Sequence, residues 1–190
     1  MTTIIKEIIV ANNKLAPLTQ FDFAKKLGVD GVCFGLCMKW VEIFLRKRGD
    51  KSTVRLRRLY DERSDALKIQ EEYERTDTTR EKVAASRGYI MKLCAAINVN
   101  MTNLHGTYLM ITSYALHPNE FTYFNFKFMR EDGSKFSHAA IAYYGKGRDS
   151  NDVVTLYEPN AGEFSDVDDL TDLLARIFED YEKKNASCIM

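Results

Sequence analysis

The sequence lacks a net charge, because its 27 lysines and arginines are balanced by 27 aspartates and glutamates among 190 residues. A strong positive field is what draws proteins to nucleic acid or to anionic membranes, so neither is expected as a partner. Long hydrophobic runs are also missing, and none approaches the roughly 18 apolar residues of a membrane-spanning helix. We therefore expect no stable membrane insertion. Residues 1–8 carry no long apolar segment behind a basic start, so a Sec signal peptide is not expected.

Cysteine is scarce, with four residues in the chain. This number is too small for a disulfide scaffold in a chain of this length, and reduced thiols in a cytosol are expected. Hydrophobic residues make up 45% of the sequence and charged residues 28%, which is enough to fill a core and to cover it with a polar surface. We expect one domain over residues 1–190, with no cofactor and no metal.

The first half of the chain, up to about residue 103, has the pattern of helices. Apolar residues recur with the helical period in residues 32–46, which predicts a buried central helix whose inner face is formed by Cys33, Leu36, Cys37, Trp40 and Phe44. Residues 51–87 are rich in charges of both signs and predict one or two helices with a solvated face. A second buried helix is expected over residues 87–97.

The second half, from about residue 104, has the pattern of strands. Alternation of apolar and polar side chains predicts a strand over residues 120–130, with Phe124, Phe126 and Phe128 on one side. Asp-Gly-Ser at residues 132–134 is typical of a hairpin turn. A return strand and a further strand are expected over residues 135–144 and 152–157.

A helix is expected near the end of the chain. Ser165 has the residue type of an N-cap, and Asp166, Asp168 and Asp169 would form an acidic first turn. The apolar residues that follow recur at helical spacing. The predicted fold class is therefore α+β, with a helical part followed by a mostly antiparallel sheet and a C-terminal helix.

Cys33 has the position of a nucleophile. It is expected in the first turn of the central helix, where backbone N–H groups have no intrahelical acceptor and the helix dipole is positive. This environment favours the thiolate, which is the reactive form of cysteine. Cys37 lies one turn further along the buried stripe and is expected to be a core residue. A zinc site built from Cys33, Cys37 and a histidine is not expected, because a second ligand pair is missing.

A histidine and an acid follow on successive predicted strands. His138 shares one face of the return strand with Phe136 and Ala140, and Glu158 lies at the end of the next strand. If the two strands are neighbours, the Glu158 carboxylate can orient the His138 ring, and the other ring nitrogen can hold the Cys33 proton. The order along the chain is then cysteine, histidine, acid.

Three short motifs resemble those of the YopT-type bacterial effector proteases, which are papain-like cysteine proteases. The motifs are Gly-Val-Cys-x-x-Leu-x-x-x-Trp at residues 31–40, Ser-His-Ala at residues 137–139 and Glu-Pro-Asn-Ala-Gly-Glu-Phe at residues 158–164. The resemblance implies a papain-like fold in which Cys33 is the nucleophile, His138 the general base and Glu158 the orienting acid. That family usually has aspartate in the third place, and papain relatives use asparagine, so Asn160 is the alternative orienting residue.

The resemblance also implies an oxyanion hole beside the nucleophile. Papain-like enzymes form it from a backbone N–H group and from the side-chain amide of an upstream Gln or Asn. In this sequence the backbone group would be the N–H of Cys33, and Gln20 is the nearest upstream amide. Together they would stabilise the negative charge that develops on the attacked carbonyl oxygen.

The predicted function is therefore that of a thiol hydrolase, a cysteine protease that cleaves a specific host protein. The resemblance implies a virulence effector that is secreted without a Sec signal peptide and acts in the host cytosol. A monomer is expected. Relatives in that family cleave lipidated Rho-type GTPases or protein kinases. A small GTPase or a kinase is accordingly the expected class of substrate.

Two alternatives stay open. A protein glutamine deamidase or transglutaminase would use the same cysteine, histidine and acid on the same fold, and the chain is short for a protease with extended subsite loops. A binding module would have kept the fold and lost the chemistry. Glutamate in place of aspartate at residue 158 and the lack of an amide immediately before Cys33 favour this second alternative.

Overall fold

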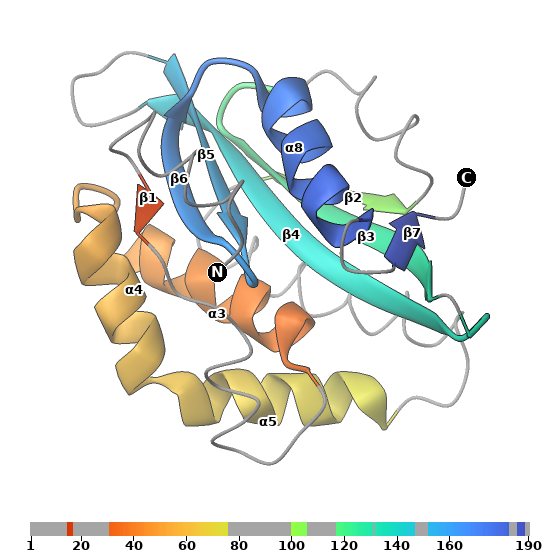
Figure 1. Cartoon of the computed structure of the whole chain (residues 1–190). Coiled ribbons are helices and arrows are strands. Elements are labelled where there is room, and N and C mark those ends of the chain that lie inside the picture. Colours follow the sequence, from red (N-terminus) through yellow and green to blue (C-terminus); the bar gives the residue numbers. More distant parts are fainter. Residues whose placement is uncertain are drawn as a thin grey trace.

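The computed structural model describes residues 15–16, 31–75, 100–105, 117–130, 132–146, 152–182 and 186–188 (Figure 1). Four helices lie in these residues: α3 (Cys33–Arg46), α4 (Ser52–Asp61), α5 (Arg63–Glu74) and α8 (Leu170–Glu182). The strands in the same residues are β1 (Leu15–Ala16), β2 (Asn100–His105), β3 (Glu120–Arg130), β4 (Lys135–Lys146), β5 (Asp152–Glu158), β6 (Gly162–Val167) and β7 (Ala186–Cys188). The predicted α+β class is confirmed, whereas the helix predicted over residues 87–97 lies outside the described residues.

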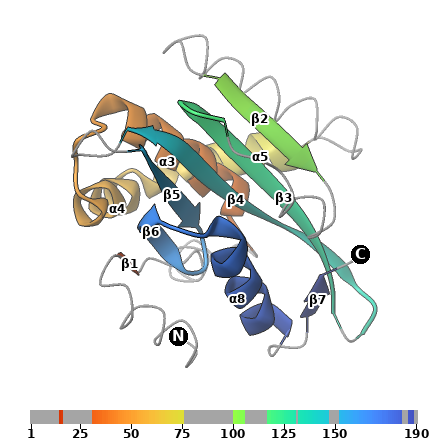
Figure 2. The same cartoon turned by 90° about the horizontal axis from the view of Figure 1, so that it is seen from above.

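The described strands form one sheet in the order β1-β6-β5-β4-β3-β2, and β7 also pairs with β3. From β1 to β3 in this order, neighbouring strands are antiparallel, whereas β2 is parallel to β3. Helices α3, α4 and α5 lie on one face of the sheet, and α8 lies on the other (Figures 1 and 2). The sheet is therefore the middle layer between two helical layers.

Strand alternation divides the apolar side chains between two cores. Phe124, Phe126 and Phe128 of β3 pack in the core that also contains the buried leucines of α8, on one side of the strand as the sequence predicts. Phe121 and Tyr123, at odd positions of the same strand, belong to the core beneath α3. Both faces of the sheet thus bury apolar surface, which is the main driving force for folding.

Helix α3 approaches α5 closely at Gly35. A Cβ atom at this position would overlap the backbone carbonyl oxygen of Ala66 on α5, so the approach requires glycine. Next to this contact, the rings of Phe34 and Tyr73 stack with their centroids 4.2 Å apart. The C-terminal half of α5 is thereby held against the first turn of α3.

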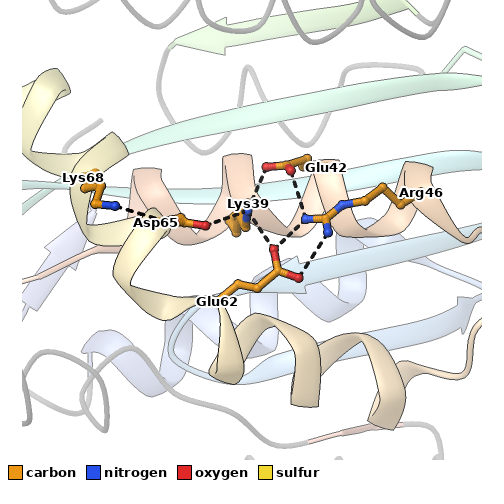
Figure 3. A network of polar contacts seen from close by, with 6 residues as sticks. All are labelled: Lys39, Glu42, Arg46, Glu62, Asp65 and Lys68. Carbon is orange, nitrogen blue, oxygen red and sulfur yellow. Dashed lines mark hydrogen bonds and ion pairs between the residues drawn. The ribbon is translucent and has the colours of Figure 1, made fainter.

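A network of charged side chains connects α3 to α5 and to Glu62, the residue that directly precedes α5. The network in Figure 3 consists of Lys39, Glu42, Arg46, Glu62, Asp65 and Lys68. The Nζ atom of buried Lys39 lies 2.8 Å from Glu62 and 3.1 Å from Glu42. Burial lowers the pKa of Lys39, but the hydrogen bonds to Glu62 and Glu42 outweigh it and raise the pKa above its ordinary value. The charge-rich segment predicted as solvated helices therefore also supplies carboxylate partners for a buried cation.

The predicted N-cap at Ser165 is wrong. Ser165 lies in β6, and α8 begins later, at Leu170. The Asp172 N–H donates to Oδ1 of Asp169 over 3.0 Å, so Asp169 caps this helix. The local composition around Ser165 is that of a helix start. β6 nevertheless pairs with β5, Phe164 opposite Leu156, and this pairing holds the segment in an extended strand.

The sheet also gains strands that the sequence pattern did not predict. β1 lies in a segment for which the sequence pattern predicts no strand, and it pairs with β6, Leu15 opposite Phe164. β2 begins at Asn100, just before the predicted start of the sheet part at residue 104. Such short strands carry little periodicity of their own, and their partners in the sheet determine them.

Candidate active site

Cys33 is the first residue of α3, and its side chain is half-buried. The Leu36 N–H donates to the carbonyl oxygen of Val32 over 2.9 Å, which places Cys33 in the first helical turn, as the sequence predicts. Cys37, one turn further on, is fully buried. Of the two cysteines of α3, Cys33 is therefore the one that remains accessible.

A cavity of about 240 Å³ opens beside Cys33. Four elements form its walls: α3 contributes Cys33 and Phe34, α5 contributes Gln70 and Tyr73, and β3 and β4 contribute Asn125 and His138. The thiol and the imidazole predicted to react together thus line the same cavity, although 104 residues separate them in the chain. This volume is smaller than that of typical pockets for small molecules and suits a single side chain or a short stretch of backbone.

The ring of His138 lies against the carboxylate of Glu158. Nε2 of His138 contacts Oε1 of Glu158, and both side chains are almost completely buried. The other carboxylate oxygen, Oε2, accepts the backbone N–H of Asn160 over 2.9 Å. Cys33 lines the cavity with His138 and contributes to raising the pKa of its ring. Because Nε2 is engaged by Glu158, Nδ1 is the ring nitrogen available to the Cys33 sulfur.

The sheet register explains how His138 and Glu158 meet. β4 and β5 are antiparallel neighbours, as the predicted contact requires, and their ladder ends at the pair Ile141 and Tyr157. Glu158 directly follows Tyr157 on β5, and His138 precedes Ile141 by three residues on the antiparallel strand β4. Both side chains are therefore at the same end of the ladder, where the first turn of α3 is also located.

The environment of His138 favours its protonated form. Burial by itself lowers the pKa of the imidazole, but the charge of Glu158 and the interaction with Cys33 outweigh it and raise the pKa from 6.5 to about 10. At neutral pH the ring is accordingly an imidazolium ion next to the Cys33 sulfur. This is the charge state that stabilises a neighbouring thiolate.

Cys37 has the opposite character. Complete burial, together with the negative charge of Cys33 and of Glu158, raises the pKa of the Cys37 thiol well above its ordinary value. Cys37 is therefore a neutral thiol packed in the core, as the sequence predicts, and the two cysteines of one helix differ in accessibility.

Comparisons of this chain with protein-family models, with curated proteins and with solved structures give no match. The motif resemblance therefore remains the source of the family hypothesis. Within the described residues, no helix has the length and apolar composition needed to cross a membrane. No cluster of three or more His, Cys, Asp or Glu side chains that could hold a metal occurs in that part of the chain either.

Motif residues without a predicted chemical role connect α3 to the sheet. The ring of Trp40 stacks on Tyr157 of β5, with centroids 5.7 Å apart, and its Nε1–H donates to Oε2 of Glu163 over 2.7 Å. Glu163 is fully buried and also forms an ion pair with Arg55 of α4. The tryptophan of the first motif and the second glutamate of the third motif are thus in direct contact.

Two cavity residues with amide side chains were missed by sequence reasoning. Asn125 of β3 lines the cavity together with Tyr73 and Tyr123, and Gln70 of α5 is buried. The alternation of β3 does place Asn125 on the face of Tyr123, opposite the phenylalanines, so a signal for it existed. No comparable signal marks Gln70, because its contact with α3 depends on how two helices pack. The predicted oxyanion residue Gln20 lies outside the described residues.

Proposed function

We propose that this protein is a cysteine hydrolase of the papain-like type that cleaves a peptide bond of another protein. One observation carries the proposal: Cys33, in the first turn of α3, lines the same cavity as His138, whose ring contacts the buried Glu158 carboxylate. A nucleophile, a base and a group that orients the base are the three parts that thiol-dependent acyl transfer requires.

The proposed reaction begins with the Cys33 proton on His138. The thiolate attacks the substrate carbonyl carbon, and the C=O electron pair moves to the oxygen, where the backbone N–H of Cys33 stabilises it. Collapse of this intermediate breaks the C–N bond, and the leaving amine takes the proton from His138. Water then gives a proton to His138 and attacks the thioester. This second step releases the carboxylic acid and restores the Cys33 thiolate.

The papain-like part of the proposal is supported by the relation of helix and sheet. A largely buried helix presents cysteine at its N-terminus, and the antiparallel strands beneath it carry histidine and the acid. Of the three motifs that resemble those of the YopT-type effector proteases, the first and the third are joined by Trp40 and Glu163, and the second contacts the third through His138 and Glu158. By the same resemblance, we propose a secreted effector whose substrate is a host protein such as a small GTPase or a kinase.

Glutamine deamidation is the second candidate. It would use the same residues, with a substrate side-chain amide in place of the backbone amide and ammonia as the leaving group. The volume of the cavity, about 240 Å³, is compatible with this reaction because it suits the entry of one side chain as well as of a short stretch of backbone.

A single experiment separates these functions. Peptides derived from a host-cell proteome are incubated with the full chain and, as the matched control, with Cys33→Ala, and the products are identified by mass spectrometry. New N-termini that only the wild type produces indicate a protease. Conversion of glutamine to glutamate without chain cleavage indicates a deamidase. A third outcome is that neither product forms and that Cys33 does not react with a thiol-directed epoxide inhibitor. The protein is then a binding module, and the enzyme proposal is wrong.

A further inference from the structure

The first turn of α3 is capped from another helix. Val32 at the N-cap position has no side-chain hydrogen bond to offer, and no acidic residue lies in the first turn. Instead, the Gly35 N–H donates to Oε1 of Gln70, a buried residue of α5, over 3.0 Å. The contact takes up one of the N–H groups that every helix start leaves without an intrahelical acceptor.

A second contact fixes the orientation of the Gln70 amide. Its Nε2 donates to Oε1 of Glu74, one turn later on α5, over 2.8 Å. A flipped amide would place Nε2–H against the Gly35 N–H and Oε1 against the carboxylate, so both contacts exist in one orientation only. Glu74 thereby directs the carbonyl oxygen of Gln70 toward the start of α3.

The neutral charge of this acceptor matters because Cys33 lies two residues before Gly35 in the same turn. Helix N-termini are commonly capped by Asp as well as by Ser, Thr or Asn, since the helix dipole favours a negative group there. A carboxylate at this place would repel a thiolate on Cys33, because nearby like charges disfavour each other. The amide oxygen satisfies the Gly35 N–H without adding that charge. The titratable side chains that share the cavity with Cys33 are Tyr73 and Glu74 of α5, Tyr123 of β3 and His138 of β4, and all of them are the same in the variants compared at residue 70.

We propose that Gln70 is a positioning residue, which caps the first turn of α3 with a neutral oxygen and so keeps the Cys33 thiol reactive. Gln70 acts through the helix start, although it also lines the cavity. The inference rests on the proposed function in one respect only, namely that Cys33 is the reactive thiol. Its test therefore uses thiol reactivity and needs no substrate.

The test is the pH dependence of Cys33 alkylation by iodoacetamide, followed by mass spectrometry that resolves Cys33 from Cys37. Gln70→Glu is made in a Glu74→Gln background, so that the new carboxylate faces an amide and not a second carboxylate, and its midpoint is compared with that background. The substitution then keeps an acceptor and the side-chain length but adds a negative charge. We expect the midpoint of the rate profile to move to higher pH by about 0.5 unit, the size of a charge effect at a helix terminus. Ser64→Glu adds the same charge at an exposed position near the start of α5 and is expected to leave the midpoint unchanged. An unchanged midpoint in folded Gln70→Glu overturns the proposal.

A second variant keeps the proposal testable if Gln70→Glu does not fold. Gln70→Met removes the acceptor at nearly constant length and adds no charge. We expect the Gly35 amide proton to exchange with solvent about tenfold faster or more, because its acceptor is lost. Unchanged exchange of this proton would show that Gln70 does not cap α3, which also overturns the proposal.

The two proposals fail in different ways. A wild-type chain that shows the alkylation profile and its shift in Gln70→Glu but never cleaves or deamidates a peptide refutes the proposed hydrolase and leaves the role of Gln70 in place. The opposite result is also possible: the wild type cleaves peptides through Cys33, but Gln70→Glu leaves the alkylation midpoint unchanged. This result supports the proposed hydrolase and refutes the role of Gln70.

Discussion

The charge of the imidazole ring is the residue-scale property on which the proposed chemistry depends. His138 is buried between the Glu158 carboxylate and the Cys33 sulfur, and these neighbours hold a proton on a group that burial alone would neutralise. Glu158 therefore has two effects on the ring, since it orients Nδ1 toward Cys33 and favours the imidazolium form.

Glu158→Gln tests the second effect. The amide keeps a hydrogen-bonding group beside Nε2 but removes the negative charge, so the pKa of His138 is expected to fall from about 10 toward or below its ordinary value of 6.5. NMR titration of the histidine ring protons measures this directly in a chain with three histidines. A His138 resonance that still titrates near pH 10 in the variant would contradict the role given to Glu158.

The same substitution changes how stability depends on pH. A histidine whose pKa is raised on folding binds more protons in the folded state, so its stabilising contribution is complete below about pH 6.5 and is lost as the pH rises through about 10. The wild type should lose stability over that interval, whereas Glu158→Gln should show a much flatter profile. Urea unfolding at a series of pH values provides the comparison.

The two cysteines of α3 should respond differently to the same substitution. Cys33→Ala is expected to abolish catalysis and inhibitor labelling with a change in unfolding free energy within about 0.5 kcal/mol, because the side chain is half-buried at a helix end. Cys37→Ala leaves a void in a fully buried place and should cost about 1 to 2 kcal/mol while Cys33 still reacts. Loss of Cys33 labelling in a folded Cys37→Ala chain would contradict this division of roles.

At the scale of elements, α3 and α5 come into close contact at Gly35. Gly35→Ala places a Cβ atom against the carbonyl oxygen of Ala66, so the helices must separate and the Gln70 contact must lengthen. We expect a loss of about 1 to 3 kcal/mol from overpacking, partly offset by the higher helix propensity of alanine. Thermal unfolding measures the loss.

Gly49 provides the matched control for this substitution. It is exposed just after α3, and no atom lies within 4 Å of a Cβ atom built there. Gly49→Ala makes the same chemical change in open space and should leave the melting temperature nearly unchanged. Equal destabilisation by both substitutions would show that the loss does not arise from helix contact.

The elements that could be predicted from the sequence are those with a strong period of their own. The buried stripe of α3 and the alternating phenylalanines of β3 carry this information locally, and their bounds agree with the prediction to within one residue. β6 could not be predicted, because Ser165 and the aspartates after it have the composition of a helix start. Contacts of Phe164 and Glu163 with other elements override that preference and extend the strand.

At the scale of the whole molecule, the site was predictable where its residues stand in short motifs and unpredictable where it depends on packing. Cys33 occupies a position that helical periodicity marks, His138 and Glu158 stand in short motifs, and adjacent strands bring these two together. Gln70 lies at the site because α3 and α5 pack closely at Gly35. No local pattern in the sequence of α5 predicts this contact. Long-range geometry of this kind is a property of the fold and not of a segment.

Arg55, Glu163 and Trp40 form a buried polar group that joins the helices to the sheet. Substitutions in this group test whether the helices and the sheet unfold together. Glu163→Gln retains an acceptor for the Trp40 Nε1–H but leaves the Arg55 guanidinium buried without its carboxylate. We expect a loss of about 3 to 5 kcal/mol, the usual cost of removing one partner of a buried ion pair. Urea unfolding is followed by fluorescence of Trp40, the single tryptophan of the chain, and by circular dichroism of the helices.

The double variant Arg55→Met, Glu163→Gln removes both charges and should recover most of this loss, because an uncompensated charge is then no longer buried. The two probes should give one coincident transition in the wild type and in both variants, since Trp40 lies on α3 and contacts β5 and β6 at once. A double variant as unstable as Glu163→Gln would show that the loss comes from altered packing around Trp40 and not from the unpaired charge. Separate transitions for the two probes would show that the helices and the sheet unfold independently, and that this buried group does not hold the cysteine and the histidine on one cooperative unit.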